Sequence, residues 1–473
     1  MTERNYTTVN PCIMCQPIGS VMAFKGIEDS MVLLHGSQGC STYMRLHLAH
    51  HFREPVDIGS SSLSERGAVY GGSENLKKGL KNLILRYNPK VIGVSTTCLA
   101  ETIGDDIGRI ISEFREEEEE ELASDVIIIP VPTPSYEDSH NSGYIKAVEA
   151  IVKEFTTGEN ASDIFNNKLN VVLSENVSPE DTRELKNILS NTIGPNSFIL
   201  LPDISETFDA PMTGELQKIF PGGTTHADIA DMKNSATTIG LGITNDNRAV
   251  GYLEQTFDIP SQNLPLPIGL EYTDRLLAAL SKIAGTDILD QYQKERGRLI
   301  DAMVDSHKYV YGTKVAIYGD PNNVLGMLSL ALENGMHPIL VVASSKSPRF
   351  AEYAMERVKQ VKPDCDVTIL EDVDFDAFND AIKKAKPEIM IGNSNGKYIA
   401  KEMGIPLVRV GFPIHDRVGA QRILATGYRG AMEMLDRITN TILEAQEEKL
   451  AAKLSEPESY VPLGEDSFHS AEA

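Results

Sequence analysis

The stretch KVAIYGDPNNVLGMLSLALENGMHPILVVA, residues 314–343, decides the fold of this chain. Its first part, Lys314–Tyr318, is a short apolar run typical of a buried strand, and Gly319–Pro321 predicts a turn after it. An apolar helical pattern then runs to Gly335, and a second strand-like run follows at Ile339–Ala343. The stretch therefore predicts a β-α-β unit with two parallel strands.

The same region carries further strand-like runs, which predict a doubly wound sheet. They lie at Val367–Leu370, Ile389–Gly392 and Leu407–Gly411. The turn at Gly319 lacks the spaced glycines that close approach to a dinucleotide pyrophosphate requires. The sequence contains no Walker-type phosphate loop, so we do not expect this chain itself to bind ATP.

Two earlier stretches show the same alternation of strands and helices. In the first, Val91–Ser95 and Val126–Pro130 are strand-like. In the second, the strand-like run Asn170–Leu173 is followed by the helix-opening signal Ser178–Asp181. Such alternation favours parallel sheets over an all-helical or all-strand architecture. We predict an α/β fold of three doubly wound, Rossmann-like domains whose parallel sheets are flanked by helices.

The composition is that of a soluble globular protein, with 41% hydrophobic and 24% charged residues. No apolar run is long enough to span a bilayer, and the polar N-terminus, Met1–Val9, lacks an export pattern. We therefore expect a cytoplasmic protein without a membrane anchor. A formal net charge of −24 argues against nucleic acid as a partner. The acidic run Glu116–Glu121 is interpreted as a solvated surface segment.

Two cysteines occupy loops that suit an anionic ligand. Cys40 and Cys98 each follow a strand-like run and precede a helical pattern, which places their sulfur atoms at helix N-termini. The helix dipole and the free backbone N–H groups favour thiolate there. Gly36 and Gly39 remove side-chain bulk beside Cys40, so that the backbone can approach a bulky inorganic group.

The remaining cysteines carry weaker signals. Cys12 and Cys15 form a lone C-x-x-C pair, whereas structural zinc would need a second pair. A single cysteine is as readily a small buried hydrophobe, but Cys15, Cys40 and Cys98 together make that alternative weak. An iron-sulfur cluster usually needs four or more protein ligands, so three well-placed cysteines imply a second chain. Cys365, far along the chain, is interpreted as an ordinary thiol.

A chain of 473 residues exceeds what one hydrophobic core usually supports, so several domains are expected. The polar residues from Thr157 to Asn167 mark one boundary. The predicted units are an N-terminal arm with the first cluster cysteine (1–19), a cluster-binding α/β domain (20–165), a second α/β domain (166–312), a third α/β domain (313–446) and a polar C-terminal tail (447–473).

The three cysteine segments, taken with several motifs elsewhere, resemble the nitrogenase component 1 family, and within it the beta subunit of the molybdenum-iron protein. The likeness extends from Val9 to about Leu443. Joint occurrence of the motifs in this order is highly specific. The motifs are His51–Pro55, Ala68–Gly72, Thr97–Cys98, Gly104–Asp106, Thr133–Tyr136, Glu295–Asp301, Ile391–Ser394 and Gly411–Arg417.

The resemblance implies a cofactor shared between two subunits. Cys15, Cys40 and Cys98 would hold one half of an 8Fe-7S P-cluster, whose other half an alpha subunit holds. Ser135 matches a serine that can ligate iron in the oxidised cluster, although a turn residue is the ordinary alternative. Tyr70 matches an aromatic residue on the surface that docks an ATP-hydrolysing iron protein. A tyrosine that faces the core is the competing interpretation.

The resemblance also implies an interfacial divalent cation, calcium or ferrous iron. Asp301 and Asp305 are four residues apart on a predicted helix, so both carboxylates face one side. Exposed ion-pairing positions usually explain such spacing. The family instead combines the pair with a glutamate and a backbone carbonyl of a second beta subunit, here Glu54 and the carbonyl of Arg53. An all-oxygen ligand set suits either cation.

The resemblance further implies the function of an electron-relay subunit in an α2β2 heterotetramer. The iron protein would deliver electrons through the P-cluster to a cofactor of the alpha subunit, where dinitrogen is reduced, so no catalytic residue is assigned to this chain. One alternative is a scaffold subunit for cofactor assembly, because such scaffolds share the segment His35–Cys40. Another alternative is a nitrogenase-like reductase that acts on a different substrate, because the partner subunit sets substrate choice.

Overall fold

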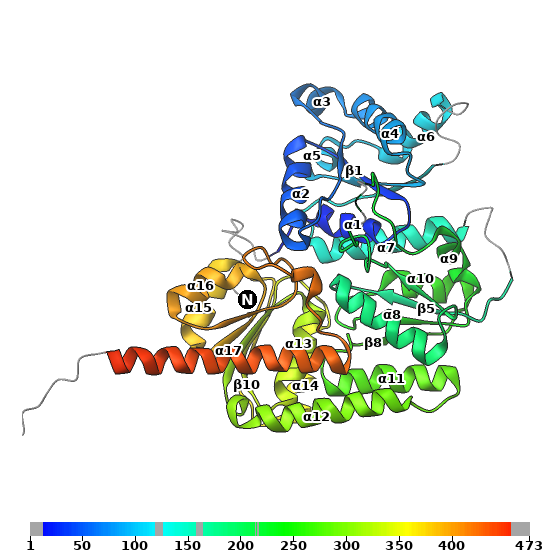
Figure 1. Cartoon of the computed structure of the whole chain (residues 1–473). Helices are drawn as coiled ribbons and strands as arrows, with labels where there is room; N and C mark the ends of the chain where they lie inside the picture. The colour runs from blue at the N-terminus through cyan, green and yellow to red at the C-terminus, as the bar shows by residue number, and fades with distance from the viewer. Residues whose placement is uncertain (1–12, 119–125, 158–163, 213, 215–216, 456–473) are drawn as a thin grey trace, which may run out of the picture.

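The computed structural model describes residues 13–118, 126–157, 164–212, 214 and 217–455. The chain folds as an α/β protein with three parallel sheets, each flanked by helices (Figure 1). In Figure 1 the first sheet and its helices lie at the top, the second sheet lies on the right, and the third lies at the lower left. Within the described residues, no helix is both long enough and apolar enough to cross a membrane.

The third sheet contains the predicted β-α-β unit. Strand β9 (Lys314–Gly319), helix α13 (Pro321–Glu333) and strand β10 (His337–Ala343) follow one another, and the two strands pair in parallel. The sheet has the order β11-β10-β9-β12-β13, so the chain winds outward from β9 in both directions. The predicted doubly wound sheet is confirmed here. Its other strands are β11 (Thr368–Glu371), β12 (Ile389–Gly392) and β13 (Leu407–Arg409).

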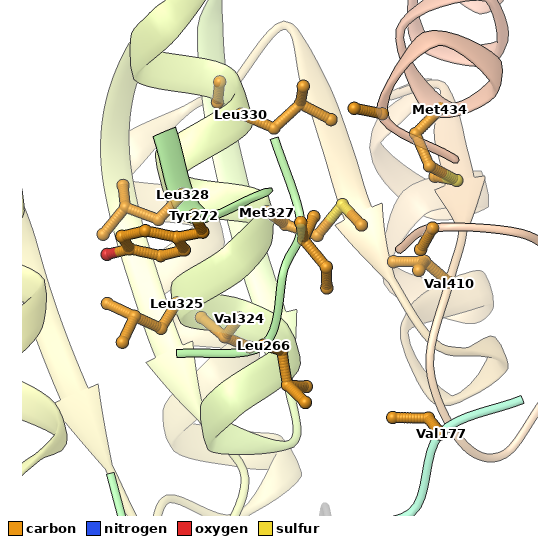
Figure 2. Close-up of a cluster of buried hydrophobic side chains, with 14 of the residues drawn as sticks. Val177, Leu266, Tyr272, Val324, Leu325, Met327, Leu328, Leu330, Val410 and Met434 are labelled. Atoms are coloured by element: carbon orange, nitrogen blue, oxygen red, sulfur yellow. The ribbon is translucent and has the colours of Figure 1, made fainter. Parts of the chain in front are cut away.

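Helix α13 is buried on nearly all sides, as its almost unbroken apolar sequence predicts. Figure 2 shows Leu325, Met327 and Leu328 of this helix among side chains that include Tyr272 and Met434. Full burial of one such side chain stabilises the fold by about 1.5–3 kcal/mol. The helix thus joins the third sheet to the second through one shared core.

The first and second sheets share one winding pattern. Their orders are β2-β1-β3-β4 and β6-β5-β7-β8, and every pair of neighbouring strands is parallel. A second core joins these two sheets. The first sheet comprises β1 (Ser30–His35), β2 (Gly59–Ser60), β3 (Val91–Thr96) and β4 (Ile127–Val131). The second comprises β5 (Leu169–Leu173), β6 (Phe198–Leu201), β7 (Thr237–Leu241) and β8 (Ser261–Leu264).

The α-helices cover the faces and connect the strands. Where Ser178–Asp181 predicts a helix start, Ser178 caps helix α8 through a reciprocal bond with Asp181. Besides α13, the helices are α1 (Gln16–Lys25), α2 (Gln38–Phe52), α3 (Glu65–Tyr70), α4 (Ser73–Tyr87), α5 (Cys98–Ile103), α6 (Ile107–Glu118), α7 (His140–Thr157), α8 (Pro179–Ile193), α9 (His226–Asp231), α10 (Arg248–Phe257), α11 (Leu270–Ala284), α12 (Asp290–Val310), α14 (Phe350–Val361), α15 (Phe375–Ala385), α16 (Lys397–Met403) and α17 (Gly427–Ser455).

Helices α1 and α7 cross at unusually short range, and two glycines permit it. A Cβ atom on Gly19 would lie 1.8 Å from the carbonyl oxygen of His140. A Cβ atom on Gly143 would lie 2.0 Å from the carbonyl oxygen of Gln16. Because every residue of α1 is buried, this crossing fixes the position of the helix start, where Cys15 stands.

Some predictions concern chain segments that the structure describes only in part. Glu116 and Glu117 are exposed near the end of α6, which ends at Glu118, and residues 119–121 of the acidic run lie outside the described residues. Helix α17 continues past residue 447 to Ser455, and Figure 1 shows its far end projecting from the body of the molecule. Helix α1 spans the predicted boundary between residues 19 and 20. The domain boundaries stay a prediction.

Candidate functional site

Three loops of the first domain meet at one edge of its sheet. Strands β1 and β3 are parallel neighbours, with His35 opposite Thr96, and β4 pairs with β3 on its other side. The loops after these strands therefore leave the same carboxyl edge. They carry Cys40, Cys98 and Ser135 in turn.

Cys15 reaches this edge by a different route. It stands at the N-cap of α1 and forms a short antiparallel bridge with Ser139, which follows the Ser135 loop. The backbone N–H of Gln16 donates to Ser135 Oγ at 3.1 Å. The backbone N–H of Ser135 donates to Cys98 Sγ at 3.2 Å. Ser135 therefore lies between the Cys15 and Cys98 segments.

All three cysteines stand at helix N-termini, as the sequence predicts for two of them. Cys15 is the N-cap of α1, Cys40 lies in the first turn of α2, and Cys98 is the first residue of α5. Each cysteine is partly exposed. A helix N-terminus stabilises a nearby negative charge by about 0.3–1 kcal/mol, so these positions suit thiolate ligands.

The thiols also influence one another electrostatically. Burial raises the pKa of Cys15, a hydrogen bond with Ser135 lowers it, and the neighbouring Cys98 and Cys40 raise it. Three thiolates at this edge would therefore repel one another unless positive charge lies between them. Binding of a metal group would release the protons and remove that repulsion.

The ligand set fits a group that a second chain helps to hold. In the described part of the chain, no three His, Cys, Asp or Glu side chains converge closely enough to hold a metal ion by themselves. Three partly exposed sulfur atoms at one edge instead suit a larger cluster with several irons and with further ligands from outside. Cys12, the other half of the C-x-x-C pair, lies outside the described residues.

Gly36 packs against Thr97, whereas the sequence suggests that it makes room for an inorganic group beside Cys40. A Cβ atom on Gly36 would lie 2.0 Å from Thr97 Oγ1, whereas a Cβ atom on Gly39 would find only Ser37 Oγ, at 3.8 Å. Thr97 itself donates through Oγ1 to the carbonyl oxygen of His35 at 3.1 Å. Gly36 thus allows the Cys40 and Cys98 loops to pack tightly against each other.

Cys365 belongs to another part of the molecule. Its Sγ lies 3.4 Å from the carbonyl oxygen of Pro338 at the start of β10, in the third sheet. Burial raises the pKa of the Cys365 thiol, which favours the protonated form. It provides no ligand at the carboxyl edge of the first sheet.

Tyr70 ends helix α3 and is 83% exposed, and the adjacent Val69 is 74% exposed. The interpretation of Tyr70 as a core residue is therefore wrong. Two large apolar side chains at the end of a short helix form a small protruding contact surface. Figure 1 shows α3 at the top of the first sheet, close to α5.

The four residues of the predicted cation site divide into two pairs. Asp301 and Asp305 are both exposed on α12, whereas Arg53 and Glu54 follow the end of α2. Figure 1 shows α2 in the upper half of the molecule and α12 at its lower edge, with the third sheet between them, so one chain does not bring the pairs together. Burial and the charge of Asp209 raise the pKa of Glu54.

The polar residues that support the cysteine loops were not among the residues predicted from the sequence. His35 is fully buried, and its Nε2 lies 2.9 Å from Asp105 Oδ2. Its Nδ1 lies 3.0 Å from Ser61 Oγ. A polar residue at the end of an otherwise apolar strand, directly before Gly36, was the available signal. Its partners could not be found that way, because they lie far away in the sequence.

The fold and the edge together define a class of protein: an α/β chain with three parallel sheets and with three partly exposed cysteines at one edge of the first sheet. Comparison with known proteins identifies that class more closely. The family model described as "Nitrogenase component 1 type Oxidoreductase" matches residues 15–443. The chain belongs to this family of oxidoreductase subunits.

Individual relatives support the assignment over nearly the whole chain. The nitrogenase molybdenum-iron protein beta chain of Methanococcus maripaludis is 41% identical over 467 residues, which are 96% of this chain and 99% of that one. The beta chain of Clostridium pasteurianum is 36% identical, over 94% and 95% of the two chains. The solved structure "Nitrogenase Cp1 at pH 6.5" matches with a TM-score of 0.89 at 35% identity, covering 95% and 96% of the chains.

Proposed function

We propose that this chain is the beta-type subunit of a nitrogenase component 1, in which Cys15, Cys40 and Cys98 hold one half of an 8Fe-7S P-cluster. When bound, that cluster supplies one-electron storage and transfer between the ATP-hydrolysing iron protein and a cofactor of the alpha subunit, the place of dinitrogen reduction. The chain's own residues bind and orient this group, and none of them carries out the reduction.

The observation that supports this proposal is the meeting of three thiols from separate segments at one carboxyl edge. Each thiol stands at a helix N-terminus, and each remains partly exposed. By contrast, the cysteine ligands of a single metal ion that one chain binds by itself would be buried within that chain. Partial exposure is what a group shared with an alpha-type subunit requires, and an α2β2 heterotetramer follows if each alpha-beta pair then associates with a second pair.

Ser135 has the chemistry of an additional ligand in the oxidised state. Its Oγ accepts the N–H of Gln16, and its hydroxyl forms a hydrogen bond with Cys15. Iron bound at this edge would favour loss of the hydroxyl proton to solvent. The resulting alkoxide would be a hard oxygen ligand, which would suit more oxidised iron. The position of Ser135 between Cys15 and Cys98 supports this role.

The exposed end of α3 suits the docking of a partner. Tyr70 offers a large amphipathic side chain, and aromatic residues of this kind often anchor protein contacts. Val69 adds apolar area beside it. We assign this surface to the iron protein.

The two exposed carboxylates of α12 suit a cation between two beta-type subunits. Asp301 and Asp305 would come from one copy, while Glu54 and the carbonyl oxygen of Arg53 would come from the other. Oxygen ligands of this kind suit calcium or ferrous iron. Shared binding would explain why the two pairs lie apart in one chain.

Iron analysis and cluster spectroscopy on the purified complex of both subunits test the proposed function. An 8Fe-7S signature at the subunit interface is expected. A single 4Fe-4S centre would instead support the assembly scaffold and would contradict the relay. Dinitrogen reduction by the complex with its iron protein separates the proposed activity from that of a related reductase with another substrate.

A further inference from the structure

The exposed end of α3 is joined to the interior by hydrogen bonds from a main-chain N–H to a buried side chain. Gly71 and Gly72 follow Tyr70, and the N–H of Gly72 donates to both carboxylate oxygens of Asp105, at 3.1 Å and 3.0 Å. Only 9% of the Asp105 side chain is exposed. Any movement of the Tyr70 segment on contact with a partner therefore acts directly on this carboxylate.

Asp105 is hydrogen-bonded to His35, the last residue of strand β1. It follows α5, the short helix that begins at Cys98, and its Oδ2 accepts from the Nε2 of His35 at 2.9 Å. The ring of His35 is completely buried, and its Nδ1 is held by Ser61 Oγ at 3.0 Å. Ser61 Oγ in turn accepts the backbone N–H of Gly36 at 3.0 Å.

The main chain of His35 then holds both cysteine loops. Its carbonyl oxygen accepts the N–H of Thr97 at 3.0 Å and the Oγ1 hydroxyl of Thr97 at 3.1 Å. Thr97 directly precedes Cys98, while Gly36 opens the loop that leads to Cys40. A continuous set of hydrogen bonds thus connects the exposed Tyr70 segment with the loops of two cysteines.

We propose that Asp105 and His35 are positioning residues that transmit docking at the Tyr70 surface to the Cys40 and Cys98 loops. This inference rests on the proposed function, because it takes that surface to be the docking site and those cysteines to be ligands. It goes beyond that function by naming the residues through which docking at the Tyr70 surface would control electron delivery at the edge of the first sheet.

The energetics favour movement of this set as a unit. Separating one buried partner from the others leaves an unsatisfied polar group, which costs about 1–3 kcal/mol. A charged carboxylate in a nearly dry environment costs more. Displacement of Gly72 is therefore followed by Asp105 and His35, since retaining the hydrogen bonds is the cheaper response.

The experiment uses the intact complex of both subunits, with Asp105→Ala and Asp105→Asn as variants. Asp106→Ala is the matched control, because Asp106 is the adjacent carboxylate, is exposed, and accepts the backbone N–H of Arg109 in the first turn of α6 at 3.0 Å. The iron protein is titrated against each complex, and the rate of electron transfer at saturation is measured separately from the half-saturating concentration.

Asp105→Ala is expected to lower the saturated rate at least about tenfold, which corresponds to about 1.4 kcal/mol in the barrier. The half-saturating concentration should change by less than about twofold, because the docking surface itself remains. Reduction by a small chemical reductant, which needs no docking, should match the wild type, and so should the iron content. Asp105→Asn should restore most of the rate, since its amide can bond both Gly72 and the other tautomer of His35.

Three results would overturn the inference. The first is a wild-type saturated rate in Asp105→Ala, and the second is an equal loss in Asp106→Ala. The third is loss of iron from Asp105→Ala, which would assign the residue a purely structural role. Tyr70→Ala separates this inference from the proposed function. If Tyr70→Ala leaves the half-saturating concentration unchanged, the docking surface itself is wrong; if it weakens docking while Asp105→Ala behaves as wild type, only this inference fails.

Discussion

Ser135 shows how much one residue contributes at this edge. It accepts a backbone hydrogen bond beside Cys15 through its hydroxyl, and it donates one to Cys98 through its own N–H. The second bond can persist when the side chain is replaced by any residue other than proline, because its donor is the backbone N–H. A substitution of the side chain therefore tests the proposed role of the hydroxyl as an iron ligand while the bond from the Ser135 N–H to Cys98 remains.

Ser135→Ala should keep the iron content of the resting complex and change its oxidised state. The three cysteines still hold the group, but the alkoxide ligand is lost, so the spectrum and reduction potential of the oxidised form should shift. Loss of the bond to Gln16 should also lower the free energy of unfolding by about 1 kcal/mol. Redox titration followed by electron paramagnetic resonance measures the shift.

Ser142→Ala is the matched control for that titration. Ser142 also bonds to Gln16, through the side-chain amide at 3.3 Å, but among the described residues it has no hydrogen bond with a cysteine. It should leave the oxidised spectrum as in the wild type. Identical oxidised spectra of Ser135→Ala and the wild type would refute a ligand role for Ser135.

At the scale of elements, the crossing of α1 and α7 determines where Cys15 lies. The strands β1, β3 and β4 bring Cys40, Cys98 and Ser135 to one edge by their parallel order alone. Cys15 precedes the first strand and has no such constraint. Its position is set instead by the contact of α1 with α7 and by the bridge between Cys15 and Ser139.

Gly143→Ala should therefore displace Cys15 as well as destabilise the chain. The new methyl group would meet the carbonyl oxygen of Gln16, which cannot rotate away as a side chain can. Such overpacking costs about 1–3 kcal/mol, and the shift of α1 should lower the iron content of the assembled complex. Denaturant unfolding and iron analysis measure the two effects.

Gly297→Ala provides the control for a glycine in a helix. A Cβ atom on Gly297 meets nothing within 4 Å, so this substitution in α12 should be neutral or stabilising by about 0.5–1 kcal/mol. Its iron content should equal that of the wild type. Full stability and iron content in Gly143→Ala would show that the α1–α7 crossing does not position Cys15.

At the scale of the whole molecule, His51 connects the first domain to the third. It lies in the last turn of α2, and its Nδ1 accepts the backbone N–H of Ile414, after β13, at 2.9 Å. Its ring also packs at 4.9 Å from that of Phe412. Burial lowers the pKa of His51 to about 3, and Nδ1 can accept the N–H of Ile414 only while the ring is neutral.

This contact should weaken in acid. In the unfolded chain His51 gains a proton below a pKa of about 6.5, while in the folded chain it stays neutral down to about 3. Between these values the unfolded state binds more protons, so stability falls as the pH falls, by up to about 1.4 kcal/mol per pH unit from this group. Stability is not affected by this group above the unfolded pKa.

His51→Asn should flatten the pH dependence of unfolding between about pH 6.5 and 3, because an amide oxygen can accept the same N–H without gaining a proton. Its stability at neutral pH should be lower, since the ring contact with Phe412 is lost. His50→Asn, at the exposed preceding position, should keep the wild-type slope. Denaturant unfolding at a series of pH values gives the slopes, and parallel slopes for all three proteins would contradict the explanation.

Some elements of the fold can be predicted from the sequence, and others cannot, for physical reasons. The unit β9-α13-β10 is evident because each element is apolar over its full length and is bounded by turn residues. The strand-to-helix loops of Cys40 and Cys98 follow from the same local patterns. Strand β8 escaped notice because it is a short edge strand with polar, exposed positions.

Contacts between residues far apart in the sequence could not be predicted from local sequence patterns. Nothing local to His35 predicts that its partner is Asp105, because the pair forms only when the fold brings two loops together. Helix α3 is too short for its pattern to distinguish an exposed Tyr70 from a buried one. The resemblance to a known family indicated an exposed aromatic residue there, and the structure agrees.

The most direct test of the central claim is the cluster content of cysteine variants in the assembled complex. Cys40→Ala and Cys98→Ala should each abolish the 8Fe-7S signature and substrate reduction, since each removes one of the three thiolates that this chain provides. Cys365→Ala removes a thiol from the third domain and should retain both properties. A wild-type cluster and wild-type activity in Cys40→Ala or Cys98→Ala would contradict the account.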